Sequence, residues 1–568
     1  FILILITFNV YAVDPRLNWK TVETQNFFIH YAVGYERLAQ KTANIAEYVH
    51  KKLQVKIHWQ PLDKTHLVIS DETDSANGFA TMLSFSRSVL FMAPPQAATS
   101  LEDFDDWLET LITHEYTHIL HLDKVSGGAG LLRNIFGRQF LLFPNLYQPN
   151  WFIEGLATYY ETDASKGIGR GQSSLFQMMM RSEVEQGIKP ISQVNLPIRS
   201  WPMGTVSYLY GVHFYQFLED TYGQQSIENL IDNYSDNIIP FMINTNTEHV
   251  FDKNVTELWS DFSFWLQKRY QPEVLAQHKA GLVEGKKITD LGYNTSVLDH
   301  AYDGRYYIEG YDEFIGNAGI YYIADGAFEH AALMQRINHK THFVINVHRG
   351  AKINTHPEAG VLIIQNEFCD EYNVNSDLYL LANDKSHLKR ITECGRYRSA
   401  SWSADGQSIV AIKTEKGKSQ LVLLSTNGEL IKTLWSGNNT DIATQLKTSP
   451  LGKYLVAAVF RETSGWNIEE FNLENLSWKA ITHDHYIDMY PSYSEKGDAI
   501  LFSSDRLEKG QEKDKVNRYQ IYRYVKENAE IQQLTRVKNG AFSPIQNNLK
   551  SPLYYVGYHS SGRDIYQL

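Results

Sequence analysis

The sequence predicts a multidomain protein in which an α+β domain is followed by an all-β propeller of six blades. Three observations lead to this fold class. Strand-like and helical patterns alternate up to about residue 285, helical patterns almost vanish after it, and a glycine-containing turn then recurs at a nearly constant interval. The chain has 568 residues, which is long enough for two domains of this kind.

Composition narrows the class of protein further. Hydrophobic residues make up 43% of the chain, which argues against a disordered protein. A formal net charge of -12 argues against nucleic acid as a partner, and no basic run indicates an anionic membrane surface. The two cysteines, Cys369 and Cys394, are too few for a disulfide scaffold or a cysteine-ligated zinc ion, so a metal would need His and carboxylate ligands.

The first residues form an apolar stretch, FILILITFNVYA, with small residues at Val10 and Ala12. This pattern is typical of the end of a secretory signal that is cleaved after Ala12, and the alternative is a buried strand. We expect residues 1–12 to be a signal remnant and the protein to be exported, to a bacterial periplasm or in association with an outer membrane. No later stretch approaches the ~20 apolar residues of a transmembrane helix.

Residues 13–270 are predicted to form the α+β domain. Phe27–Val33 and Thr65–Ser70 have strand patterns, and Tyr35–Leu53 is typical of an amphipathic helix. Further helical patterns cover roughly residues 101–124, 151–162, 204–221 and 255–269. Residues 271–285 show no clear period and contain Pro and Gly, which predicts a linker.

Residues 286–568 are predicted to form the propeller. A glycine turn at Gly304 is followed by others at Gly360, Gly406, Gly452 and Gly497, and the last three intervals are 46, 46 and 45 residues. A unit of this length with four short strands is what a propeller blade requires, and the alternative is a β-sandwich. The sixth unit lacks a fourth strand, which Lys286–Gly292 is predicted to supply from before the first blade, so that no sheet edge remains open.

Two of these units, SASWSADGQSIVAI and PSYSEKGDAILFSSDR, resemble the repeat of the periplasmic TolB-type propeller. The resemblance covers roughly residues 286–568. It implies a scaffold or a binding surface, for which a protein partner is a candidate, and by itself no chemistry. Cys369 and Cys394 are predicted to lie in loops on one face of the same blade, where an oxidising compartment permits a disulfide; two separate thiols are the alternative.

The stretch LITHEYTHILHL contains His114-Glu115-x-x-His118 inside a helical pattern. Ser100, followed by Asp103, is expected to cap this helix. Residues four apart lie on one face of a helix, so the two imidazoles can bind one zinc ion, and Glu115 is placed to accept a proton from water. A helix that merely carries two histidines is the alternative.

A catalytic zinc ion needs a third protein ligand, and Glu154 in the stretch NWFIEGLATYYE is the candidate. The two motifs together resemble those of the gluzincin metallopeptidases, the thermolysin and aminopeptidase superfamily, over roughly residues 19–235. The family pattern W-x-x-E-G-x-A-x-Y is matched by Trp151, Glu154, Gly155, Ala157 and Tyr159. The resemblance implies a thermolysin-like metallopeptidase domain that holds one Zn2+ through His114, His118 and Glu154; a surface glutamate is the alternative for Glu154.

The 35 residues between His118 and Glu154 exceed the spacer of the best-known members. Their Gly-rich and apolar sequence suits a flap over the cleft or a surface for a partner. His121 is a rival ligand, but we expect it to lie behind the ligands or to face solvent. Beside the cleft, Ser88–Pro95 is a candidate edge strand for an extended substrate, or an ordinary strand, and Glu72–Met82 is a candidate lining loop.

The resemblance also implies a tyrosine that stabilises the oxyanion formed when water attacks a peptide carbonyl. In aminopeptidase-type members, Tyr-x-x-Gly precedes an apolar helix, and Tyr208 with Gly211 fits this spacing. Tyr210 does not fit the spacing, although it is close enough to compete. A tyrosine that only packs is the alternative for Tyr208.

Two functions are compatible with the sequence. In the first, the protein is an exported zinc metallopeptidase that cleaves a peptide or protein substrate, with Glu115 and Tyr208 as catalytic residues and the propeller as a docking surface. In the second, the propeller is a binding scaffold and the zinc domain is inactive or structural. Glu115 favours the enzyme, because a structural zinc site does not need a carboxylate beside its first ligand.

Overall fold

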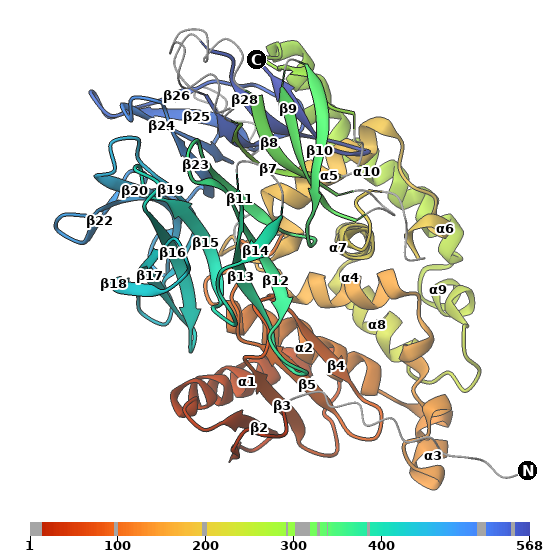
Figure 1. Cartoon of the computed structure of the whole chain (residues 1–568). Helices are drawn as coiled ribbons and strands as arrows, with labels where there is room; N and C mark the ends of the chain where they lie inside the picture. The colour runs from red at the N-terminus through yellow and green to blue at the C-terminus, as the bar shows by residue number, and fades with distance from the viewer. Residues whose placement is uncertain are drawn as a thin grey trace, which may run out of the picture.

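The computed structural model describes residues 14–95, 100–195, 201–290, 294–301, 319–325, 330–337, 339–382, 387–507, 518–546 and 551–568. The expected signal remnant lies outside the described residues. An N-terminal α/β region packs against a ring of six four-stranded sheets (Figure 1). The predicted combination of an α/β region and a six-bladed propeller is therefore confirmed.

The N-terminal region begins with a mixed sheet of five strands. These are β1 (Trp19–Glu23), β2 (Phe27–Ala32), β3 (Thr65–Ser70), β4 (Gly78–Thr81) and β5 (Arg87–Phe91), in the order β1-β2-β3-β5-β4. Helix α1 (Glu36–Ile57) covers the sheet with small and aliphatic residues at helical spacing, among them Ala39, Ala43 and Ala46. The candidate edge strand at Ser88–Pro95 was wrong, because β5 pairs on both sides and β4 forms the edge.

The remainder of this region is helical. Its helices are α2 (Trp107–Asp123), α3 (Gly127–Phe136), α4 (Asn150–Glu161), α5 (Ser174–Gln186), α6 (Ile191–Val194), α7 (Thr205–Tyr222), α8 (Gln224–Tyr234), α9 (Ile243–Phe251) and α10 (Val255–Ala280). Short 3-10 turns are η1 (Phe140–Leu142), η2 (Pro144–Tyr147) and η3 (Arg170–Gln172). Helices α4 and α7 pack side by side between α2 and the outer helices (Figure 1).

Helix α2 begins later than the sequence predicted. Asp106, not Ser100, caps it by accepting a hydrogen bond from the Leu108 amide at 3.0 Å. The preceding residues are held against the propeller: the Phe104 ring lies 4.6 Å from that of Phe460, and the Glu102 carbonyl accepts a bond from the Trp466 indole at 3.2 Å. These contacts override the local preference for helix.

The expected linker at 271–285 is largely helical. Helix α10 continues to Ala280 with Pro272 inside it, because its second half packs on α5, where Arg181 and Glu273 form an ion pair at 3.1 Å. Beyond it, Val283 exchanges two backbone hydrogen bonds of 3.0 Å with Arg536, and Gly285 donates to the Tyr555 hydroxyl at 2.8 Å. The connection is thus fastened to the propeller and not free.

Each propeller blade is an antiparallel sheet of four strands. Blade 1 contains β7 (Asn294–Ala301), β8 (Gly319–Asp325), β9 (Ala332–Ile337) and β10 (Lys340–Asn346); blade 2 contains β11 (Lys352–His356), β12 (Gly360–Phe368), β13 (Val374–Leu381) and β14 (Leu388–Arg390). Blade 3 contains β15 (Tyr397–Trp402), β16 (Ser408–Glu415), β17 (Lys418–Ser425) and β18 (Leu430–Ser436); blade 4 contains β19 (Ile442–Thr448), β20 (Tyr454–Arg461), β21 (Gly465–Asn472) and β22 (Ser477–Ala480). Blade 5 contains β23 (Asp488–Tyr493), β24 (Ala499–Ser504), β25 (Gln520–Val525) and β26 (Glu530–Gln533); blade 6 contains β27 (Gly540–Ile545), β28 (Tyr554–His559), β29 (Gly562–Gln567) and β6 (Lys286–Lys287).

The recurring glycine turns connect the first and second strands of successive blades. Gly360, Gly406, Gly452 and Gly497 have φ values of 96°, 65°, 68° and 68°. Glycine adopts this left-handed conformation without the steric cost that a Cβ would add, which explains the repeat that the sequence shows. The earlier turn at Gly304 lies outside the described residues.

The ring closes as predicted. Strand β6, which precedes blade 1 in the chain, pairs antiparallel with β29, the third strand of blade 6, through Lys287 and Tyr566. The amide of Ile288 extends this pairing by donating to the Ile565 carbonyl at 2.9 Å. The first and last parts of the propeller sequence therefore share one sheet.

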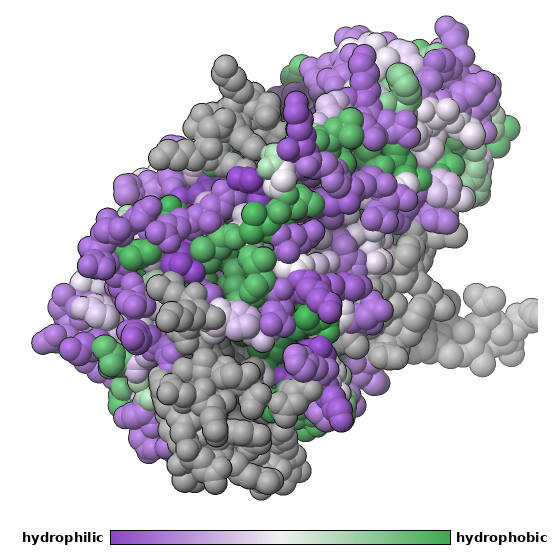
Figure 2. Space-filling model, turned by 90° about the horizontal axis from the view of Figure 1, so that it is seen from above, coloured by the Kyte–Doolittle hydropathy of each residue, from purple (hydrophilic) through white to green (hydrophobic). Residues whose placement is uncertain are grey.

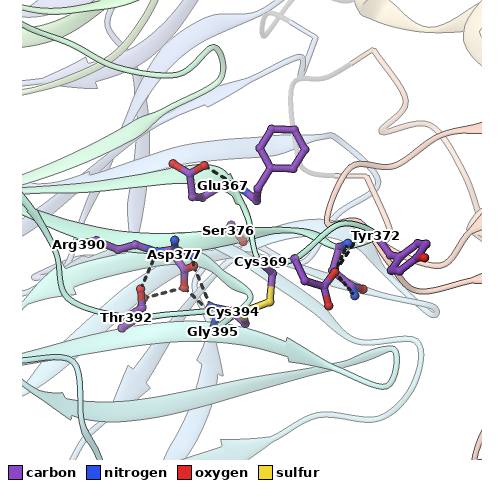
Figure 3. The surroundings of a disulfide bond; sticks show 12 residues. Glu367, Cys369, Tyr372, Ser376, Asp377, Arg390, Thr392, Cys394 and Gly395 are labelled. Carbon is purple, nitrogen blue, oxygen red and sulfur yellow. Dashed lines mark hydrogen bonds and ion pairs between the residues drawn. A yellow bond between two sulfur atoms is a disulfide. The ribbon is translucent and has the colours of Figure 1, made fainter. Parts of the chain in front are cut away.

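The predicted disulfide is also confirmed. Cys369 directly follows β12 and is bonded to Cys394, which follows β14, with a Cα–Cα distance of 5.3 Å (Figure 3). The buried carboxylate of Asp377 accepts hydrogen bonds from the amides of Cys394 and Gly395 at 2.9 and 2.8 Å. The loop that carries Cys394 is thus held in place by the disulfide and by the backbone hydrogen bonds to Asp377.

The side chains exposed on one face of the molecule are mainly polar. Seen from above, most of the coloured residues are hydrophilic, with hydrophobic residues gathered in a few streaks between them (Figure 2). No helix within the described ranges is long and apolar enough to cross a membrane.

A buried group of charges lies where the two regions meet. Glu102 and Asp103, from the segment before α2, lie near Asp505 and Arg563 of the propeller. Ser174 of α5 donates to the Asp505 carboxylate at 2.6 Å, and the Tyr519 hydroxyl group also faces this cluster. Burial raises the pKa of Glu102, and the charge of Arg563 offsets only part of this effect.

This burial predicts a specific dependence of stability on pH. A carboxyl with a raised pKa stays protonated in the folded protein at pH values where the unfolded chain ionises it. Its stabilising contribution is therefore present below the unfolded pKa and is lost as the pH rises towards the folded pKa. We expect Glu102→Gln to raise the melting temperature more at pH 8 than at pH 5. The corresponding difference in unfolding free energy is up to about 1.4 kcal/mol for each unit by which folding raises the pKa of Glu102.

Thermal unfolding of the parent and the variant from pH 5 to pH 8 measures this difference. Glu429 is exposed on the propeller, so Glu429→Gln is a matched control that should leave the pH dependence unchanged. Parallel curves for Glu102→Gln and the parent would show that Glu102 is ionised at the interface.

Candidate metal centre

The helices α2 and α4 bring the three candidate ligands together. His114 and His118 lie one turn apart on α2, and Glu154 lies on α4, which packs across it. The two histidine Nε2 atoms are 3.2 Å apart, and Glu154 Oε2 lies 3.5 Å from His114 Nε2 and 3.3 Å from His118 Nε2. Among the residues that the structure describes, this is the group of His, Cys and carboxylate side chains close enough to hold a metal ion.

These distances fit a zinc ion. Tetrahedral zinc binds His nitrogen and carboxylate oxygen at ~2.0–2.2 Å, which separates neighbouring ligand atoms by about 3.3–3.6 Å. The three observed separations lie at or close to this range. The donor set of two imidazoles and one carboxylate leaves a fourth position for water, as a catalytic zinc site requires.

The electrostatics of the site favour a cation. Burial lowers the pKa of His114, but the carboxylates of Glu154 and Glu161 outweigh it and raise that pKa to about 9. Burial acts to raise the pKa of Glu154, but hydrogen bonds to the two histidines bring it well below its usual range. The two shifts are reciprocal: the carboxylates favour a positive charge at the histidines, and the histidines favour a negative charge at Glu154, so the ligand oxygen is available as a carboxylate.

Two further residues orient the first histidine, and sequence reasoning missed both of them as participants. Glu161 Oε2 lies 2.8 Å from His114 Nδ1 and accepts its proton, which leaves Nε2 with the lone pair that a metal needs. Arg170 in turn holds Glu161 through two bonds, Nε to Oε1 at 2.7 Å and Nη2 to Oε2 at 2.8 Å. Glu161 is two helical turns beyond Glu154, a spacing that places both on one face of α4, whereas no sequence signal marks Arg170.

Glu115 lies beside the ligands in a cavity of about 350 Å³ that His114 and His118 also line. The side chain is buried, and burial raises its pKa against the opposing charges of the two histidines. Gly78, the first residue of β4, packs against it so closely that an added Cβ would lie 2.9 Å from Glu115 Oε1. A glycine at this point therefore leaves room for the carboxylate in its present position.

Tyr208 lines the same cavity. Its ring lies 6.1 Å from that of His114, the Arg170 guanidinium stacks over it at 4.6 Å, and its hydroxyl faces Glu154. Burial and the charge of Glu154 raise its pKa, so the hydroxyl stays protonated. The competing Tyr210 points elsewhere, because its hydroxyl donates to Glu183 at 2.7 Å.

A close helix crossing sets the position of Tyr208 relative to Glu154. A Cβ on Gly155 of α4 would lie 2.5 Å from the Cα of Gly211 on α7, so the two backbones touch where these glycines meet. Glu154 immediately precedes Gly155, and Tyr208 is one turn before Gly211. The glycines of both sequence motifs thus have a packing role that places the two functional side chains together.

Of the two places expected for His121, behind the ligands or towards solvent, the structure excludes the second. It is buried, with an exposed fraction of 1%, it lies near His118, and burial lowers its pKa to about 3, so it is neutral. It also lies outside the group of convergent ligand atoms. The alternative of a third histidine ligand is therefore not supported by the geometry.

The long insert between the motifs has two parts. Its last turn, η2, contributes Leu146 to the metal-site cavity. Its helix α3 lies at the edge of the molecule (Figure 1) and, with η1, exposes Leu131, Ile135, Phe136, Phe140 and Leu141. Residues Asn77–Ala80 also line the cavity. They belong to the segment that the sequence offered as a lining loop, although most of them form strand β4.

No family model matches the sequence, and no curated protein matches it. Solved structures with a similar fold include a putative TolB from Agrobacterium tumefaciens, at 20% identity over 39% of this chain and 74% of that chain, with a TM-score of 0.32. TolB from Acinetobacter baumannii matches at 17% identity over 44% of this chain and 65% of that chain, with a TM-score of 0.31. A puromycin-hydrolyzing peptidase from Mycobacterium tuberculosis matches at 9% identity over 48% and 43% of the two chains, with a TM-score of 0.32. Scores at this level support neither a shared family nor a shared function.

Proposed function

We propose that the protein is a zinc-dependent metallopeptidase that hydrolyses peptide bonds in a peptide or protein substrate. The observation that carries this proposal is the convergence of His114, His118 and Glu154 with Glu115 in one cavity. A structural zinc site is closed by four protein ligands, whereas here three converge beside a buried carboxylate. The same residues are those for which the sequence resembles the gluzincin superfamily, so we assign residues 13–270 to a domain of that type.

In this mechanism, each side chain has a separate task. A zinc ion held by the three ligands supplies a Lewis acid that activates water and polarises a carbonyl group. Glu115 accepts the proton of the attacking water and then delivers it to the leaving amine. Tyr208 donates a hydrogen bond to the carbonyl oxygen as negative charge develops there, and Glu161 keeps His114 in the required tautomer.

The sheet edge offers a place for the substrate backbone. Strand β4 pairs with β5 on one side only, and three of its residues, Gly78, Phe79 and Ala80, line the metal-site cavity. An extended peptide can add to such an edge through main-chain hydrogen bonds. This arrangement would place a peptide bond beside Glu115 without requiring a particular side chain.

The propeller is proposed to dock the substrate or a protein partner. The confirmed disulfide and the apolar N-terminal stretch support export, to a bacterial periplasm or an outer-membrane-associated location. The second candidate function is a binding scaffold with an inactive or structural zinc domain. It is favoured by the cavity of about 530 Å³ in the propeller, which is larger than the cavity at the metal site.

Metal content and hydrolysis distinguish the two functions. Purified protein should contain one zinc ion per chain and cleave a denatured protein, and a chelator should abolish cleavage until zinc is restored. Zinc at this stoichiometry without cleavage of any peptide would favour the scaffold. Protein that neither binds zinc nor cleaves would contradict the metal site itself.

Tyr208→Phe tests the oxyanion role. Removing one preorganised donor should lower turnover roughly 10- to 1,000-fold, while zinc content and melting temperature stay unchanged because only a hydroxyl is lost. Tyr210→Phe is a matched control, because it removes a hydroxyl that is bonded to Glu183 and lies away from the metal site. It should lower the melting temperature and leave turnover close to that of the parent protein. Normal turnover in Tyr208→Phe would exclude the hydroxyl from the chemistry.

A further inference from the structure

The propeller contains a second cavity, of about 530 Å³, where strands from all six blades converge. The N-terminal region covers one side of it with Asp74–Ala76 and Leu101. Leu101 also lines the metal-site cavity, and the residues that follow Ala76, Asn77–Ala80, do the same. The two cavities are therefore adjacent, since they share Leu101 and one continuous segment, 74–80, lines both of them.

The described residues that line this cavity carry an excess of positive charge. The cationic side chains are Arg349, Lys352, Arg398, Lys447 and Arg563, and the acidic ones are Asp74 and Asp325. Five positive and two negative groups give a formal charge of +3, within a chain whose net charge is -12. Positive charge concentrated in a cavity of an acidic protein favours an anionic ligand.

The two carboxylates are already engaged by other groups. Asp74 accepts hydrogen bonds from the amide and hydroxyl of Ser376 at 2.9 Å each and from Arg396 at 2.8 Å. Asp325 pairs with Arg349 at 3.1 Å at the exposed rim. Asp74 also lies close enough to Lys352 and Arg398 for its charge to act on both. The two acids therefore offset only part of the positive charge, and a formal excess of +3 remains.

Arg398 and Lys352 form the centre of this charge. Arg398 is buried, with an exposed fraction of 3%. The Nη1 atom of its guanidinium group has no hydrogen-bond partner within the described part of the chain. Lys352, on the neighbouring blade, donates from Nζ to the Arg398 carbonyl at 2.6 Å, which brings the two cations side by side. Burial and the charge of Arg398 lower the pKa of Lys352 to about 7, and burial lowers that of Arg398 to about 10.

A buried guanidinium with an unused donor, as at Arg398, favours an anion with acceptor oxygens. We propose that this cavity binds a carboxylate of a peptide at Arg398 and Lys352, while the adjoining part of the same peptide lies in the metal-site cavity. The proposal rests on the proposed peptidase function and names its substrate class, namely peptides with a carboxylate near the cleaved bond. Such a carboxylate comes from the peptide's C-terminus or from an Asp or Glu side chain.

Peptide binding separates these two sources. We would measure fluorescence anisotropy of Gly-Ala-Ser octapeptides labelled with an uncharged dye, using the full chain carrying Glu115→Gln so that no cleavage occurs. The peptides form two pairs. The first pair differs only at the C-terminus, which is a free acid in one peptide and an amide in the other. Both peptides of the second pair end in an amide, and one contains an internal Glu where the other contains Gln. We expect at least tenfold tighter binding of the free acid than of its amide, or of the Glu peptide than of the Gln peptide, and the pair that differs identifies the source.

Two variants and one control locate the binding site. Arg398→Gln or Lys352→Gln should reduce the preference to within about twofold, and the melting temperature verifies that each is folded. Lys432→Gln, an exposed lysine on the outer strand of blade 3, should leave the preference unchanged. Equal binding of all four peptides to the parent protein, or a preference that survives both cavity variants, would overturn the proposal.

The outcome remains distinct from that of the peptidase proposal. If the protein hydrolyses peptides and shows no preference for a carboxylate in binding, the proposed cavity site is refuted and the proposed peptidase activity stands. A carboxylate preference lost in Arg398→Gln, together with no hydrolysis by the zinc-loaded parent, would establish the binding site and refute the catalytic role.

Discussion

Glu115→Gln is expected to keep the zinc ion and to lose most of the hydrolytic activity. The carboxylate at this position is not among the convergent ligand atoms, so its removal leaves the metal site intact. The amide cannot accept the proton of the attacking water, and the loss of a general base costs roughly 100- to 10,000-fold in rate. Zinc content by elemental analysis and cleavage of a denatured protein measure the two properties on the same sample.

Glu109→Gln is the matched control, because Glu109 lies on the same helix and does not line the metal-site cavity. It should have the activity of the parent protein. Full activity of Glu115→Gln would show that another group takes the proton, and loss of zinc from this variant would show that Glu115 is itself a ligand.

Glu154→Ala is expected to lose the zinc ion and with it all metal-dependent activity. Two histidines alone cannot complete a site that needs three protein ligands, and the buried His114 and His118 would then lose the negative charge that faces them. Titration with zinc, followed by calorimetry, should show binding too weak to detect at micromolar concentrations of protein. Activity should not return when zinc is added in slight excess.

A graded comparison supports this assignment. Glu161→Gln retains the three ligands, but it weakens the hydrogen bond that orients His114 and removes the charge that pairs with Arg170, so zinc affinity should fall by about 10- to 100-fold. Retention of one tightly bound zinc ion by Glu154→Ala would transfer the third ligand position to another residue and contradict the assignment.

The sequence predicted the architecture where a local pattern repeats. Glycine turns need a left-handed backbone, so Gly406 and its equivalents mark each blade, and strand counting showed that the last blade lacked a partner. The beginning of α2 and the end of α10 were not predictable in this way. Residues 100–106 are kept out of the helix by aromatic contacts with blade 4, and α10 runs through Pro272 because it packs on α5. Both outcomes depend on tertiary contacts that no window of the sequence contains.

The same distinction applies to the functional residues. His114 and His118 are four residues apart on one helix, so their spacing alone predicts that they lie on one face, with Glu115 beside them. Glu154 and Tyr208 became candidates only through motifs, and the structure explains those motifs by the contact of two glycines between α4 and α7. Lys352 and Arg398 lie on the first strands of neighbouring blades, 398 minus 352, or 46, residues apart, which is the interval of the glycine turns. That interval relates their places in the repeat, but only the assembled ring shows that both line one cavity.

Ring closure has a consequence for the synthesis of the protein. Lys287 and Tyr566, which pair in the last sheet, are 566 minus 287, or 279, residues apart in the chain. At about 5–20 residues per second, β6 leaves the ribosome roughly 15–55 s before its partner strand exists. A strand that waits unpaired risks joining the wrong sheet, but β6 consists of two exposed lysines, whose charge disfavours such pairing. Strand β6 is therefore suited to its place in the chain, since it is synthesised before the blades and can pair only when β29, in the last blade, has been made.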